Sequence, residues 1–127
     1  MIGYVTLGTN DLTKAATFYD QVFAQMGAKR FMEMERFIAW QVSDAAAGVA
    51  LTEPFDGQKA TAGNGVMVAL SVDAIEQVNA VYNKAIELGA TCEGKPGFRP
   101  DLPGFYAGYF RDLDGNKLNA FCFCAPE

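Results

Sequence analysis

The chain contains the same sequence pattern twice, with the two copies about 63 residues apart. In the first copy Tyr4–Leu7, a strand-like run, leads into a helical pattern that ends at Gly27. In the second copy Met67–Leu70 leads into a helical pattern that ends at Gly89. A fixed internal period indicates repeated units that bury their apolar faces against each other. At 127 residues the chain has room for one sizeable core, so we expect a single domain built from two similar halves.

The first half is expected to contain one strand, one helix and three further strands. Period-2 and apolar runs predict the strands, and the periodic stretch predicts a helix with Thr9 or Asn10 as its N-cap. The expected elements are a strand at 2–8, a helix at 12–26 and strands at 29–34, 36–42 and 49–53.

The second half repeats this order after a connection rich in Gly and Pro at 54–65. Its expected elements are a strand at 66–72, a helix at 74–88 and strands at 91–95, 105–111 and 117–124. The prolines within 95–103 each remove a ladder donor, which predicts an irregular loop there. We therefore divide the single domain, 1–127, into a first module at 1–57, a linker at 58–65 and a second module at 66–127.

Three short motifs, taken in order within the repeat, point to a known family. Asn10–Leu12 precedes Phe18–Tyr19, Pro54–Gly57 lies in the connection, and Asp112–Lys117 supplies an Asp-Gly turn between the last two strands. This set resembles the vicinal oxygen chelate superfamily, which contains glyoxalase I, bleomycin-resistance proteins, fosfomycin-resistance transferases and extradiol dioxygenases. Leu113 stands where the family usually has proline.

The resemblance implies an α+β fold with two pseudo-symmetric β-α-β-β-β modules. They would form a cupped, partly open eight-stranded mixed sheet around a small-molecule pocket, with the helices on the outer face. Strand alternation on the last strand would then turn Leu118, Ala120 and Cys122 toward a helix and Asn119, Phe121 and Phe123 into the cup.

Metal-dependent members of the family carry His, Glu or Gln at four inward positions. Three of these positions map here to Tyr4, Met67 and Asn119, and the fourth falls within Ala50–Thr52. The chain has no histidine, and thioether, phenol and carboxamide groups do not replace imidazole or carboxylate ligands. We therefore expect no metal and no other cofactor. The alternative is a displaced oxygen-only site that uses Glu33, Glu35 or Glu53 and supports lyase, isomerase or dioxygenase chemistry.

The expected cup is rich in aromatic side chains. We predict that Tyr4, Trp40, Met67 and Phe121 line a cavity for an apolar or aromatic ligand, and that Asn119 and Tyr109 orient it by hydrogen bonds. Arg99 is expected to reach over the mouth toward an anionic group. The alternative is that the aromatic residues are ordinary core and Arg99 is simply exposed.

Composition and charge exclude some classes of binding partner. A net charge of −5 with scattered Lys and Arg argues against nucleic acid, and no segment has the length of a membrane helix or the pattern of a signal peptide. We therefore expect a cytoplasmic protein with a small-molecule ligand. Of its three cysteines, Cys122 and Cys124 lie two apart in a strand-like run and are interpreted as packing residues more readily than as a redox pair, and Cys92 has no evident activator.

The sequence thus favours a metal-free binding protein, similar in architecture to bleomycin-resistance proteins, over an enzyme. Dimerisation, common in the family, would cap the cup, so a homodimer is expected. A third reading is a non-catalytic partner-binding module whose cup is filled by its own side chains.

Overall fold

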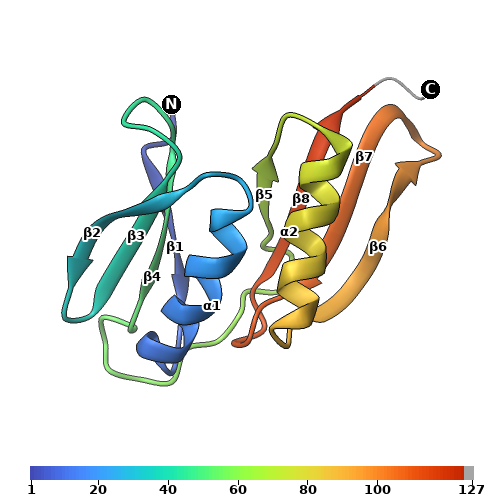
Figure 1. Cartoon of the computed structure of the whole chain (residues 1–127). Helices are drawn as coiled ribbons and strands as arrows, with labels where there is room; N and C mark the ends of the chain where they lie inside the picture. Colours follow the sequence, from blue (N-terminus) through green and yellow to red (C-terminus); the bar gives the residue numbers. More distant parts are fainter. Residues whose placement is uncertain (125–127) are drawn as a thin grey trace.

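The computed structural model describes residues 1–124 and contains the expected β-α-β-β-β order in each half (Figure 1). The elements of the first module are β1 (Tyr4–Gly8), α1 (Leu12–Ala24), β2 (Lys29–Met34), β3 (Phe37–Gln41) and β4 (Gly48–Thr52). Those of the second are β5 (Val68–Ser71), α2 (Ile75–Glu87), β6 (Thr91–Arg99), β7 (Leu102–Arg111) and β8 (Lys117–Phe123). The fold class is α+β, as predicted.

The eight strands form two open, four-stranded mixed sheets, one from each module. Sheet A has the order β1-β4-β3-β2 and sheet B the order β5-β8-β7-β6, so equivalent strands occupy equivalent places. In each sheet the module's first strand pairs in parallel with its last strand, and the other neighbours are antiparallel. A helix covers one face of each sheet, and we call the opposite faces open face A and open face B.

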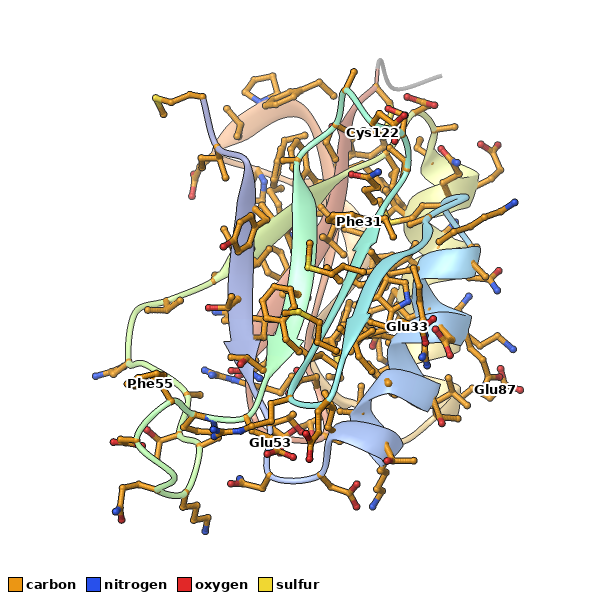
Figure 2. The ribbon with its side chains drawn as sticks, turned by 90° about the vertical axis from the view of Figure 1, so that its left-hand side faces the viewer. Phe31, Glu33, Glu53, Phe55, Glu87 and Cys122 are labelled. Atoms are coloured by element: carbon orange, nitrogen blue, oxygen red, sulfur yellow. A yellow bond between two sulfur atoms is a disulfide. The ribbon has the colours of Figure 1, made fainter. Side chains whose placement is uncertain are left out.

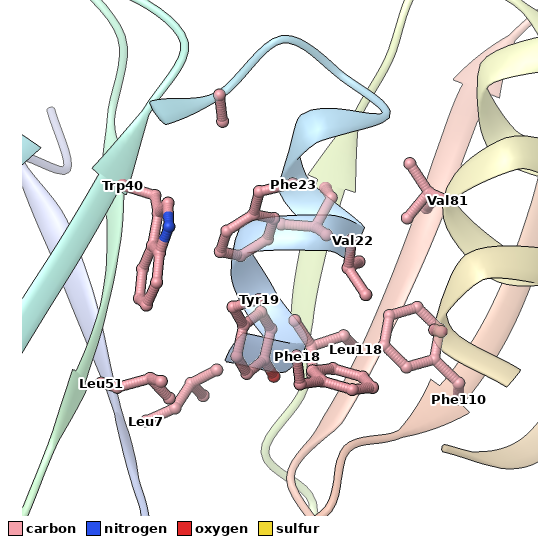
Figure 3. Close-up of a cluster of buried hydrophobic side chains, with 14 of the residues drawn as sticks. Leu7, Phe18, Tyr19, Val22, Phe23, Trp40, Leu51, Val81, Phe110 and Leu118 are labelled. Atoms are coloured by element: carbon pink, nitrogen blue, oxygen red, sulfur yellow. The ribbon is translucent and has the colours of Figure 1, made fainter. Parts of the chain in front are cut away.

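Helix α1 lies between sheet A and the second module, where it contacts α2 (Figure 1). Phe23 packs edge-on against Trp40 of sheet A, with ring centroids 5.6 Å apart, and Tyr19 lies beside the same indole. Figure 3 shows Phe18 and Val22 on the other side of the helix, toward the second module. One buried cluster therefore joins both halves, which explains why the chain forms a single core.

The β7–β8 turn also links the two modules. Asn116 Nδ2 donates to the Gly8 carbonyl oxygen at 3.0 Å, and the Asn10 backbone N–H donates to Asp114 Oδ1 at 3.0 Å. The Asp-Gly motif predicted only as a hairpin turn thus ties the end of β1 to sheet B.

The helix ends agree with the repeat, and the first helix cap differs from the prediction. Gly27 and Gly89 follow the two helices with φ of 79° and 107°, a backbone region that favours glycine. The N-cap of α1 is Asp11, whose side chain accepts from the Lys14 backbone N–H, and not Thr9 or Asn10. The Asn10 side chain instead donates to the Ala60 carbonyl oxygen and accepts from the Ala60 backbone N–H, which fixes the connection between the modules.

Within residues 1–124 no helix is long and apolar enough to cross a membrane.

The predicted loop at 95–103 was wrong. Most of it belongs to β6 and β7, with Pro96 inside β6 and Pro103 inside β7. β6 lies at the edge of sheet B, and its pairing with β7 shifts register between Gly94 and Gly97. Edge strands and bulges tolerate proline because their N–H groups need no ladder partner.

Two smaller predictions also need correction. The first is the start of β5, which lies at Val68 and not at residue 66. The second concerns Cys122 and Cys124, which were interpreted as packing residues but form a disulfide with each other. Cys122 does pack in the core on the helix-covered face of sheet B, and Cys92 is free and exposed. Residues 125–127 of the predicted second module lie outside the described residues.

Candidate ligand-binding face

The alternation predicted for β8 is confirmed. Leu118, Ala120 and Cys122 belong to the buried cluster, whereas Asn119 and Phe121 lie on open face B. Their cross-strand neighbours on β7 lie on the same face. The aromatic part of this face contains Phe105, which stacks on Phe121 with centroids 5.4 Å apart, and Phe123, whose centroid is 5.2 Å from that of Phe105.

Asn119 is the unusual polar residue of open face B. It is only 1% exposed, and Tyr109 lies directly across from it on β7. Its Oδ1 has no hydrogen-bond partner among the described residues. Burying an amide oxygen without a donor costs free energy, so this atom is suited to accept a hydrogen bond from a ligand.

Arg99 was predicted to reach over a pocket mouth from a loop, but it lies in β6 against Tyr109. Its Cζ is 5.1 Å from the Tyr109 ring centroid, and its Nη2 donates to the Ala107 carbonyl oxygen at 2.7 Å. Lys117 was missed from the sequence, although it precedes Asn119 by two residues and so shares its face. Its Nζ lies 5.8 Å from the same ring.

Tyr4 is not brought together with Asn119. Tyr4 lies on open face A, 58% exposed, with its ring edge-on to Phe37 at 6.0 Å. Met67 precedes β5 and is 40% exposed at the rim of a cavity between the modules. Within one chain, therefore, open face B holds Arg99, Tyr109, Asn119 and Phe121 of the predicted site residues.

The predicted inward orientation of Trp40 was wrong. Trp40 is 2% exposed and lies under α1, where its Nε1 donates to Asp20 Oδ1 at 2.9 Å. The pairing explains this direction, because Trp40 lies opposite Val49, and paired residues share a face. Arg30 also bonds Asp20, and this hydrogen bond lowers the pKa of the Asp20 carboxyl.

The pairing register also identifies the fourth family metal position, which the sequence left open. Asn119 pairs with Ala69 in the second module, and the repeat makes Thr6 and Ala50 the equivalent pair in the first. Ala50 has no ligand atom in its side chain. With Tyr4 and Met67 at two other positions, this donor set does not fit a divalent ion.

The glutamates of the alternative oxygen site do not converge. Glu33 pairs with Arg30, and Glu53 pairs with Arg36. Within residues 1–124, no three Cys, Asp or Glu side chains lie close enough together to hold a metal ion.

A second feature, absent from the sequence predictions, is a cavity of about 450 Å³ between the modules. Val5 and Trp40 line it from sheet A, and Val68 and Leu70 line it from β5. Its existence depends on how the two modules pack, for which no local pattern in the sequence gives a signal.

Comparisons with known proteins agree with this architecture. Residues 1–120 match the family model of the Glyoxalase/Bleomycin resistance protein/Dioxygenase superfamily. A glyoxalase/bleomycin resistance protein from Albidiferax ferrireducens T118 is 35% identical, with a TM-score of 0.87 over 96% of this chain and 98% of that one. None of the curated proteins gives a significant match.

More distant structures share the fold alone. Lactoylglutathione lyase from Agrobacterium tumefaciens is 20% identical, with a TM-score of 0.68 over 96% of this chain and 92% of that one. The fosfomycin resistance protein FosX from Listeria monocytogenes is 16% identical, with a TM-score of 0.70 over the same shares. The family model and the 35% identical structure decide the assignment: this chain belongs to the glyoxalase/bleomycin resistance protein/dioxygenase superfamily.

Proposed function

We propose that this protein binds a small apolar or aromatic molecule on open face B, without a metal ion. The observation that carries the proposal is the buried Oδ1 of Asn119, which has no partner in the described part of the chain and lies on the same face as the stacked rings of Phe105 and Phe121. An aromatic ligand would extend this stack and donate a hydrogen bond to the amide oxygen. Stacking adds about 0.5–1.5 kcal/mol to the free energy that the ring gains by burying its apolar area.

We further propose that a second copy of the chain covers the ligand. Open face A is apolar and uncovered: Tyr4, Phe31, Met32 and Met34 are all exposed on it, and Phe31 lies across the strands in Figure 2. Both open faces come from the same repeated four-stranded unit, so face A of one copy can oppose face B of the other. A two-fold axis makes both contacts at once and closes the assembly.

Ligand binding is tested with 2-naphthol, a fluorescent aromatic molecule that is neutral at pH 7 and carries a donor. Phe121→Ala is expected to weaken its binding about tenfold, since a stacking surface is lost. Tyr4→Ala is expected to weaken binding as well, because the partner's face A would supply that ring. Phe55→Ala is the control, because Phe55 lies fully exposed in the connection between the modules. If Phe121→Ala and Tyr4→Ala both bind 2-naphthol as tightly as the parent protein, the site is placed wrongly.

Dimerisation is tested by sedimentation equilibrium. Met34→Glu places a charge on open face A and is expected to shift the protein to monomer, whereas Phe55→Glu leaves the assembly unchanged. A monomeric parent protein would contradict the proposed covering of the site.

The alternative is a metal-dependent lyase, isomerase or dioxygenase with ligands away from the family positions. This second candidate function is supported by the fold, which the chain shares with lactoylglutathione lyase. Elemental analysis of protein purified without chelator separates the two functions, because one bound metal per chain would contradict the metal-free proposal.

A further inference from the structure

Open face B changes in chemical character along its length. Phe105 and Phe121 lie toward one end, Asn119 with Tyr109 lies in the middle, and Lys117 lies beyond them. Residues two apart on a strand lie about 7 Å apart on one face. The face therefore passes from an aromatic surface to an amide and then to positive charge over roughly the length of a small molecule.

Two cations lie beside the Tyr109 ring, with Lys117 beyond Asn119 along β8 and Arg99 on the β6 side, where its Nη2 bonds the Lys95 and Ala107 carbonyl oxygens. Arg99 Cζ lies 5.1 Å and Lys117 Nζ 5.8 Å from the Tyr109 centroid. Neither side chain forms a salt bridge with a carboxylate of residues 1–124, and the nearby Glu93 pairs with Arg111 instead. In a chain with a net charge of −5, two such cations on one face are available to an anion.

The amide between the two ends needs a donor. Asn119 Oδ1 is buried and has no hydrogen-bond partner within residues 1–124, and Tyr109 lies opposite Asn119 on β7. The Lys117 side chain, on the same face, makes no hydrogen bond or salt bridge with residues 1–124 and is free to move toward a bound anion, whereas Arg99 is held by the Lys95 and Ala107 carbonyl oxygens. A ligand that carries an N–H or O–H group near the middle of its length would pair with Oδ1.

From this arrangement we propose that the ligand of open face B is an aromatic carboxylate with a hydrogen-bond donor between its ring and its acid group. This inference rests on the proposed function and names its ligand class. The ring packs on Phe105 and Phe121, the donor reaches Asn119, and the carboxylate pairs with Arg99 and Lys117.

Three compounds that differ by one group each test the proposal by calorimetry. Hippurate (N-benzoylglycine) carries the ring, an N–H and a carboxylate in this order. Its methyl ester lacks the charge, and benzoyloxyacetate lacks the N–H. We expect hippurate to bind at least tenfold more tightly than either compound in low salt, and added salt to reduce its advantage over the ester.

Variants assign each contact. Arg99→Gln is expected to weaken hippurate about tenfold and to leave the methyl ester unchanged, whereas Lys14→Gln, an exposed lysine on α1, changes neither. Asn119→Leu is expected to remove the preference for hippurate over benzoyloxyacetate. Equal affinity for hippurate and its ester would overturn the ligand class and leave the proposed function standing. Absence of binding by all three compounds and by 2-naphthol would overturn both.

Discussion

Tyr19 Oη donates a 2.6 Å hydrogen bond to Asp112 Oδ2, and this buried contact joins α1 of the first module to the β7–β8 turn of the second. Burial, together with the neighbouring Asp112 carboxylate, raises the pKa of Tyr19 well above its usual value of 10.0. Burial also raises the pKa of Asp112, although its hydrogen bonds from Tyr19 and Asn116 act in the opposite direction. The contact therefore favours a neutral phenol at the junction between the modules.

Tyr19→Phe is expected to lower the free energy of unfolding by about 1–3 kcal/mol, because a buried carboxylate loses a donor. Urea unfolding at pH 7 measures the change. Tyr106→Phe is the matched control, since its hydroxyl donates to Asn79 at 2.7 Å within the second module and is only partly buried. A loss of about 1 kcal/mol or less is expected for Tyr106→Phe. An equal loss in both variants would show that the hydrogen bond between the modules stabilises the protein no more than the one within the second module.

The same contact predicts a pH dependence at the alkaline end. The folded pKa of Tyr19 is raised, so its stabilising contribution is complete below the unfolded pKa of about 10 and is lost as the pH rises through the folded pKa. Above pH 10 the advantage of the parent over Tyr19→Phe is expected to shrink by about 1.4 kcal/mol per pH unit. Urea unfolding of both proteins at pH 8 to 11 checks this, and a constant difference would contradict it.

Asn119→Leu is expected to raise the free energy of unfolding of the unliganded protein by about 1 kcal/mol, because it removes a buried acceptor that has no donor among residues 1–124. Asn116→Leu is the matched control on the same hairpin. Its Nδ2 donates to the Gly8 carbonyl oxygen and to Asp112 Oδ2, so its replacement is expected to destabilise the protein. Thermal unfolding separates the two signs, and destabilisation by both variants would mean that Asn119 is satisfied in solution.

Gly108→Ala is expected to destabilise the protein by about 1–3 kcal/mol, since overpacking strains a close contact. A Cβ atom at residue 108 would lie 3.0 Å from Pro96 Cγ and 3.2 Å from Tyr82 Cδ2, where α2 packs on sheet B. Gly3→Ala meets no atom of the described residues within 4 Å and is expected to be neutral. Urea midpoints of the two variants give the comparison, and a neutral Gly108→Ala would show that α2 can move away at little cost.

The parts of the fold that local chemistry determines were predictable from the sequence. The repeat gave the order of the elements, Gly27 and Gly89 gave the helix ends, and the alternation along β8 placed Asn119 and Phe121 on one face. Each of these depends on residues close together in the chain.

The errors arose where distant segments decide the outcome. Pro96 is accepted in β6 because that strand lies at a sheet edge, which only the strand order reveals. Trp40 was assigned to the wrong face because the period of a five-residue strand, Phe37–Gln41, does not say which side the helix covers. The bond between Tyr19 and Asp112 joins residues 93 positions apart and has no local signature.

The two apolar sides of α1 also bear on whether the halves of this chain can exist separately. Cut from the second module, α1 would expose Phe18 and Val22 to water, and the second module would expose its surface around Phe110 and Leu118 (Figure 3). Fragments divided in the 53–67 connection should therefore be poorly soluble apart and should recover a folded complex when mixed. The duplication is visible in the sequence, yet each copy now depends on the other as a subunit depends on its obligate partner.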